Sequence, residues 1–148
     1  MNLSDGSIVR FLILQTKTLQ RVIMKTKSNS EDIISRLGGF EQLVTILDRF
    51  YDKLLDDVWI GYIFKPFDKQ KLVLDQAEFI NRSFGGPPRN YKSRNLNQIH
   101  KPLNITSGHF DRRHQILKEI LQEFNIEEDI VATWLQLDLK FKSIVINR

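Results

Sequence analysis

The sequence contains no cysteine among its 148 residues. A chain without thiols can form neither a disulfide framework nor a thiolate metal site, and it offers no cysteine nucleophile. This absence leaves the cellular compartment undecided. At this length we expect one domain whose core is large enough to fold without disulfide bonds or a structural metal ion.

Long apolar runs are also lacking. The apolar stretch Ser7–Leu14 includes Arg10, is far too short to span a bilayer, and is not followed by the small-residue cleavage site of a secretory signal. We interpret residues 1–29 as an N-terminal extension, either disordered or an amphipathic helix, with Met24 as an alternative natural start. The folded domain is expected over residues 30–148, without a role for a membrane.

The chain has no strong excess of one charge. Its net charge is +4, from 22 basic and 18 acidic residues, and residues 1–23 alone hold three basic groups and one acidic group. Removing them leaves 19 basic and 17 acidic groups, a net of +2 that alternates in sign along the remaining chain. Nucleic-acid binding, which favours a concentrated basic surface, is therefore not expected.

Several catalytic signatures are missing. No cluster of about three ligands suggests catalytic zinc, and Gly85–Gly86 precede prolines rather than the start of a phosphate-binding helix. A Ser-His-Asp arrangement stays open, although no strand-turn-helix nucleophile elbow is present.

What is present is helical periodicity. No alternating run exceeds four residues, so strands are not expected and the fold class is all-α. Gly38–Gly39 and Gly85–Pro88 are strong helix breakers that divide the pattern. We expect helices over residues 33–37, 40–55, 69–84, a short one near 96–100, 106–124 and 127–146.

Two polar residues interrupt apolar helix faces. Gln76 lies within the stripe formed by Leu72, Phe79 and Ile80, where a buried amide needs a hydrogen-bond partner or a ligand. Tyr51 closes the apolar face of the preceding helix. Each also has a simpler interpretation: Gln76 as a glutamine that only packs, and Tyr51 as a core tyrosine. A role in ligand binding requires that both side chains reach one cavity.

Three histidines are available. His109 and His114 are five residues apart, which places them on different faces of one helix and makes them poor joint metal ligands. His100 lies on a short segment between the glycine-proline break and Pro102. A lone histidine beside apolar residues is often a satisfied core residue, but a single axial histidine in an all-helical, phenylalanine-rich domain is what haem iron requires.

Five sequence features in this order resemble the truncated haemoglobins, the two-over-two helical globins. The similarity extends from Ile33 to the C-terminus, about 115 residues, and it implies a two-over-two sandwich of helices around haem. The features are LGG (Leu37–Gly39), FYDKLLDD (Phe50–Asp57), Phe64, FGGPP (Phe84–Pro88) and NQIHKPLNITSGHF (Asn97–Phe110).

The resemblance assigns roles to individual residues. His100 resembles the proximal ligand of the iron in haem b, while Tyr51 and Gln76 resemble the distal pair that faces a bound ligand, as in the first subgroup of the family. The further cofactor-binding residues that it implies are Phe50, Phe64, Leu72, Phe79, Ile80, Tyr91 and Leu103.

The chain departs from its relatives at several positions. Asp75 stands where a basic residue often approaches a haem propionate, which leaves Lys71 and Arg94 as candidates for that role. Arg113 falls on the pocket-facing side of its helix, where an apolar residue is usual. We predict that it pairs with Asp138, which is equally out of place on the last helix.

The function implied by this resemblance is reversible binding of dioxygen and other diatomic ligands. Hydrogen bonds from Tyr51 and Gln76 predict slow release, which favours a nitric oxide dioxygenase that forms nitrate with an unidentified reductase in the cytoplasm. Two alternatives remain: storage or sensing of a gas without turnover, and a haem-free helical interaction module. The sequence leaves the oligomeric state open.

Overall fold

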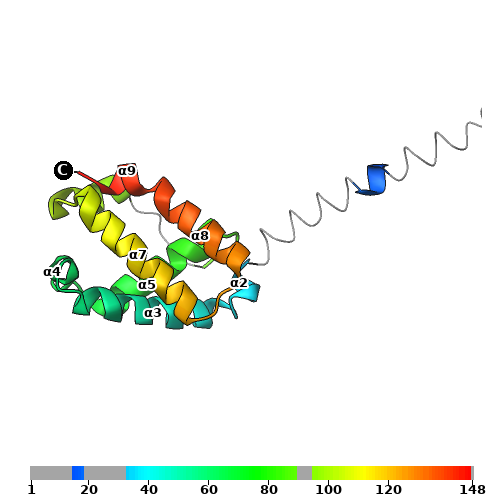
Figure 1. The fold of residues 1–148 in the computed structure, drawn as a ribbon, viewed down its shortest axis with the longest axis horizontal. Helices are drawn as coiled ribbons and strands as arrows, with labels where there is room; N and C mark the ends of the chain where they lie inside the picture. Colours follow the sequence, from blue (N-terminus) through cyan, green and yellow to red (C-terminus); the bar gives the residue numbers. More distant parts are fainter. Residues whose placement is uncertain (1–14, 19–32, 90–94, 148) are drawn as a thin grey trace, which may run out of the picture.

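The structure is a computed structural model that describes residues 15–18, 33–89 and 95–147 (Figure 1). Within these ranges all regular elements from residue 33 onward are helical and no strand occurs, which confirms the all-α prediction. The elements are α2 (Ile33–Arg36), α3 (Phe40–Asp56), α4 (Gly61–Phe64), α5 (Lys69–Ser83), α6 (Leu96–His100), a 3-10 turn (Lys101–Leu103), α7 (Ser107–Glu123), α8 (Glu128–Lys140) and α9 (Lys142–Val145).

The four long helices form two pairs. Helix α3 packs against α5, and α7 packs against α8, while contacts between α3 and α7 join the two pairs. In Figure 1 α3 lies along the lower edge of the domain and α8 along the upper edge, with α5 and α7 overlapping between them in this view. This is the two-over-two arrangement expected from the sequence. The predicted extension over residues 1–29, apart from 15–18, lies outside the described residues.

The helix ends follow from local sequence. Asp68 caps α5 by accepting a hydrogen bond of 2.8 Å from the Lys71 backbone N–H, and Thr106 accepts one of 3.2 Å from the His109 backbone N–H at the start of α7. Gly39 precedes α3 with a φ of 88°, a conformation that favours glycine. These caps hold the long helices in a defined register.

The last predicted helix is interrupted in the structure. The prediction of one helix over residues 127–146 was wrong at Phe141, which lies between the end of α8 at Lys140 and the start of α9 at Lys142. The Phe141 ring packs edge-on against Phe79 of α5, with 5.1 Å between ring centroids. This tertiary contact accompanies the break and directs the C-terminal segment toward α6, which α9 contacts.

The core is centred on α3 and the inner faces of α7 and α8. Phe50 and Leu54 of α3 are completely buried, as is Ile120 of α7, and Trp134 of α8 packs edge-on against Phe84 at 5.8 Å. No helix in the described part of the chain is long and apolar enough to cross a membrane. The packed core forms one wall of the cavity described next.

Candidate haem-binding site

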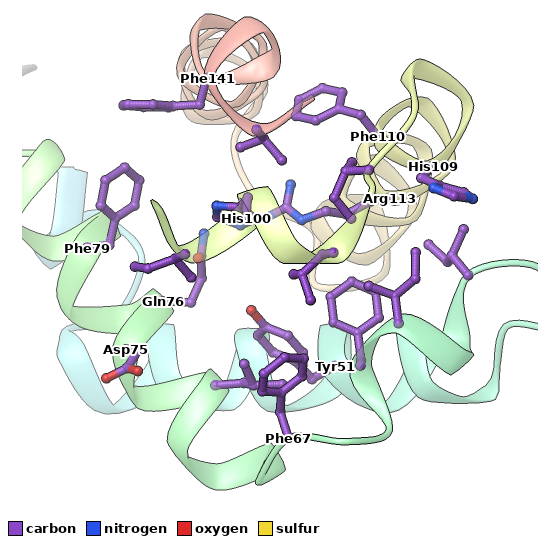
Figure 2. Close-up of a pocket in the computed structure, with 18 of the residues that line it drawn as sticks. Tyr51, Phe67, Asp75, Gln76, Phe79, His100, His109, Phe110, Arg113 and Phe141 are labelled. Atoms are coloured by element: carbon purple, nitrogen blue, oxygen red, sulfur yellow. The ribbon is translucent and has the colours of Figure 1, made fainter. Parts of the chain in front are cut away.

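A cavity of about 290 Å³ lies between the two helix pairs and is bordered by α6. Figure 2 shows side chains from several elements pointing into this space, including Tyr51, Gln76 and His100. Its walls are mostly aliphatic and aromatic. The predicted site residues that line it are Tyr51, Phe64, Leu72, Gln76, Phe79, Ile80, His100 and Leu103.

Phe50, one of the predicted cofactor-binding residues, has a different placement. Phe50 is not among the residues that line the cavity; it is completely buried behind Tyr51, with ring centroids 5.4 Å apart in an edge-to-face contact. In this position Phe50 supports the Tyr51 ring from the core side. Tyr91 lies outside the described residues, as does Arg94.

His100 ends α6 and is tied to the C-terminal segment. The Asn95 side chain caps α6 by accepting a hydrogen bond of 3.2 Å from the Gln98 backbone N–H. The Asn147 side-chain amide donates to the His100 carbonyl at 2.5 Å, and the Asn147 backbone N–H donates to the Ile105 carbonyl at 3.1 Å. The backbone that carries the imidazole is therefore held from both ends.

Tyr51 and Gln76 bring polar groups to the cavity. Tyr51 is only 6% exposed, yet neither its hydroxyl nor the Gln76 amide forms a hydrogen bond with another described residue. Burial raises the pKa of Tyr51, and the nearby positive charge of Arg113 only partly opposes that effect. The hydroxyl is therefore protonated at neutral pH and available as a donor into the cavity, toward which both groups point in Figure 2.

Arg113 and Asp138 form the ion pair that the sequence analysis predicted. Arg113 Nη1 lies 2.6 Å from one carboxylate oxygen of Asp138, and both residues line the cavity. The structure adds a third member, because His114 Nδ1 lies 2.7 Å from the other oxygen. Burial by itself would raise the pKa of Asp138, but Arg113 and His114 lower it below its ordinary value.

The rim of the cavity also bears charge. Lys71 forms an ion pair with Asp75 at 3.1 Å, and both are partly solvent-exposed. Lys71 is thus at the cavity edge, where a carboxylate of a bound group could reach it, but it already shares its charge with Asp75. Such exposed pairs are weak, so Lys71 could exchange partners at small cost.

Some lining residues were missed by the sequence analysis. His109 lines the cavity near its edge; its Nδ1 accepts from the Thr106 backbone N–H at 3.2 Å, and its Nε2 lies 3.3 Å from the Tyr62 hydroxyl. The Thr-x-x-His spacing at a helix start was the available signal for this capping role. The other lining residues not singled out include Ile60, Ile63, Phe67, Ile99, Ile105, Phe110, Leu137, Phe141 and Val145.

The donor set fits haem better than a bare metal ion. Among the described residues no group of three or more His, Asp or Glu side chains could hold a metal by itself. Haem needs little from the protein beyond an axial ligand and an apolar slot, because the porphyrin supplies the equatorial nitrogens. A cavity with His100 in its lining, walled by Phe64, Leu72 and Phe79, meets both needs.

Comparisons with known proteins agree with this site. The family model for bacterial-like globins matches residues 32–143. A group 1 truncated haemoglobin from Synechocystis sp. is 30% identical over 104 residues, covering 68% of this chain and 83% of that protein. The group 1 truncated haemoglobin of Tetrahymena pyriformis is 29% identical over 101 residues, with 68% and 83% covered.

Solved structures show the same architecture. The 2/2 haemoglobin from Synechococcus sp. PCC 7002, in the cyanomet state with covalently attached haem, superposes with a TM-score of 0.72 at 27% identity. The Fe(III) form of the truncated haemoglobin from Tetrahymena pyriformis gives 0.71 at 25% identity. Each alignment covers 78% of this chain and 98% of the other.

The fold and the cavity thus define a globin of the two-over-two class. Within that class the chain belongs to the truncated haemoglobins, and the two relatives compared above are of group 1. This membership confirms the family and fold inferred from the sequence and makes the protein a haem-binding globin, a class that binds diatomic gases such as dioxygen.

Proposed function

We propose that this protein holds haem b through His100 and reversibly binds dioxygen and other diatomic ligands in its cavity. The observation that carries the proposal is the convergence in one apolar space of the His100 imidazole with Tyr51 and Gln76, whose polar groups have no hydrogen-bond partner among the described residues. Polar groups that face an apolar cavity without a protein partner are candidates for contact with a ligand.

His100 supplies the protein ligand. When bound, haem would supply an iron centre that His100 ligates and that can take up a diatomic gas. The imidazole must be neutral to donate its lone pair, and its orientation depends on the backbone that carries it. The hydrogen bond from Asn147 to the His100 carbonyl restrains that backbone.

Tyr51 and Gln76 act on the opposite side as hydrogen-bond donors. A donor to an acceptor with anionic character contributes about 1.5–3 kcal/mol, which corresponds to roughly one to two powers of ten in affinity. Leu72, a half-buried residue of α5 in the cavity lining, restricts entry as an apolar gate. Both effects favour tight binding of dioxygen with slow release.

Slow release favours an enzymatic role over transport. We propose that the protein detoxifies nitric oxide, combining it with dioxygen and one electron to give nitrate. The electron must be returned for each turnover, so a reductase is required as a partner. We expect this reaction to take place in the cytoplasm, where reductases for soluble haem proteins are available.

Haem titration tests the cofactor assignment. Addition of haem to the purified chain should produce a Soret band with one-to-one stoichiometry, and His100→Ala should abolish or strongly weaken it. His109→Gln is the matched control, because His109 also lines the cavity and should leave the band intact. Equal loss in both variants would contradict the assignment of His100.

Rapid mixing distinguishes the proposed enzyme from its alternatives. Mixing the dioxygen-loaded protein with nitric oxide should yield nitrate and ferric protein within the mixing time. Haem binding without that product would favour gas storage or sensing, and failure to bind haem would favour a haem-free interaction module.

A further inference from the structure

Arg113 places a partly buried cation in the wall of the cavity. Its side chain is 19% exposed, and its guanidinium carbon lies 5.2 Å from the centre of the Phe50 ring, beside Tyr51. A guanidinium has five N–H donors. Within the described residues only Nη1 forms a hydrogen bond, to Asp138, so donors remain for another acceptor.

The negative charge opposite Arg113 is shared. Asp138 is bound by Arg113 through one oxygen and by His114 through the other, at 2.6 and 2.7 Å. A carboxylate engaged on both oxygens is a weaker counter-charge for either partner. The partly buried guanidinium therefore shares its counter-charge with His114 and can attract a further negative group on the side that faces the cavity.

The remaining carboxylates of the cavity lining belong to its rim. Asp68 is exposed and caps α5, while Asp75 is 40% exposed and paired with Lys71. In Figure 2 the Asp75 carboxylate points away from His100. Solvent screens their charges more than that of Arg113. The Asp75 charge still reaches the cavity, because together with Asp138 it raises the pKa of Tyr51 beyond the effect of burial.

Three kinds of donor meet in the interior of the cavity. The Tyr51 hydroxyl, the Gln76 amide and the Arg113 side chain all point into the space near His100 (Figure 2). Apart from Asp138, which is already bonded on both oxygens, no carboxylate belongs to this inner group. Such an arrangement complements a small acceptor that bears a negative charge, because charge-assisted hydrogen bonds are stronger than neutral ones.

We propose that Arg113 makes this cavity selective for small monovalent anions over neutral ligands. Arg113 acts as a specificity determinant, and Asp138 sets how much of its charge is available. The selectivity rests on the proposed haem site, because the anion would occupy the cavity together with haem. It goes beyond binding of neutral gases, for which a cation in the wall contributes less.

Ligand titrations of the ferric, haem-loaded protein test this inference. Azide serves as the anionic probe and imidazole as the neutral probe, each followed by the shift of the Soret band. Arg113→Met should weaken azide binding by roughly ten- to hundredfold, while imidazole binding changes much less. Arg113→Lys, which keeps the charge, should recover part of the azide affinity.

Two further variants separate electrostatics from structure. Asp138→Asn keeps an acceptor for Arg113 but removes the opposing charge, so azide should bind more tightly than in the wild type. Arg112→Met is the matched control: Arg112 is adjacent on α7 but pairs with Asp57 outside the cavity, at 2.8 Å. Its loss should leave the ratio of azide to imidazole affinity unchanged.

The outcomes are distinguishable. A normal Soret band with the same azide-to-imidazole ratio in wild type and Arg113→Met would overturn the selectivity while leaving the haem site intact. Weaker azide binding in Asp138→Asn would also overturn it, because that result indicates a structural role for the ion pair. Failure of the wild-type chain to bind haem would overturn both proposals.

Discussion

Replacement of Tyr51 by phenylalanine isolates one atom of the proposed ligand site. The hydroxyl has no hydrogen-bond partner among the described residues, whereas the ring is 6% exposed and packs edge-on against Phe50 and Phe64 at 5.4 and 6.0 Å. Phenylalanine preserves these ring contacts. The substitution should therefore change ligand binding without disturbing the core.

The substitution should weaken dioxygen binding but should not lower the stability of the fold. Loss of a hydrogen bond to a ligand with anionic character removes about 1.5–3 kcal/mol, so the dioxygen dissociation rate should rise roughly 10- to 150-fold. In the ligand-free protein the same substitution removes a largely buried hydroxyl without a protein partner. The free energy of unfolding should then stay equal or increase by up to about 1 kcal/mol.

The assay pairs two measurements on one variant. Dioxygen dissociation is followed by rapid mixing of the dioxygen-loaded protein with carbon monoxide, and stability by urea denaturation of the protein without haem. Tyr62→Phe is the matched control, because the Tyr62 hydroxyl is exposed and lies 3.3 Å from His109. It should leave dissociation unchanged.

An unchanged dissociation rate in Tyr51→Phe would refute the role of the hydroxyl as a donor to the ligand. A loss of stability above about 1 kcal/mol would refute the reasoning in another way. It would show that the hydroxyl has a partner in solution, because only the loss of a hydrogen bond made in the folded protein would cost that much stability.

Two further predictions concern stability. Burial by itself raises the pKa of Asp57, but hydrogen bonds from Arg112 and two backbone N–H groups bring it below its ordinary value. The ionised Asp57 carboxylate therefore stabilises the folded protein fully above about pH 4. This contribution to the free energy of unfolding is lost as the pH falls through the lower folded-state pKa. Asp57→Asn should flatten the acid limb of stability measured by urea denaturation between pH 7 and 2.5, and an unaltered limb would contradict this. Gly61→Ala places a Cβ 2.5 Å from the Leu55 carbonyl oxygen and should lower the melting temperature. Gly108→Ala meets only side-chain atoms at 3.5 Å or more, so it should raise the melting temperature, with a gain in the free energy of unfolding of up to about 1 kcal/mol from helix propensity. Equal effects of the two glycine substitutions in thermal denaturation would disprove the steric argument.

The long helices were predictable because their patterns are strong and local. The amphipathic face of α3 and the glycine-proline break after α5 set boundaries that agree with the structure within one or two residues. The last helix was not predicted correctly. Its apolar periodicity continues through Phe141, and nothing local shows that the ring of this residue packs against Phe79.

The candidate site was partly predictable from polar and charged residues that lie on otherwise apolar helix faces. Gln76 and Tyr51 stood out as polar groups on apolar faces, and Arg113 and Asp138 as charges on inner faces, all of which line the cavity. Phe50 shows the limit of this reasoning. Phe50 precedes Tyr51 on α3, but its ring faces the core and not the cavity. Only the packing of the helices shows which side of α3 borders the cavity.

By itself, the sequence determined the helical class, the main breaks and the identity of His100 as the candidate ligand, because these depend on periodicity and on residue chemistry within short segments. The tertiary structure decided which polar groups share one space. Tyr51, Gln76 and Arg113 come from α3, α5 and α7, and their convergence depends on how these helices cross. It also decided that His114 shares Asp138 with Arg113, since a contact across 24 residues arises from packing and not from local pattern.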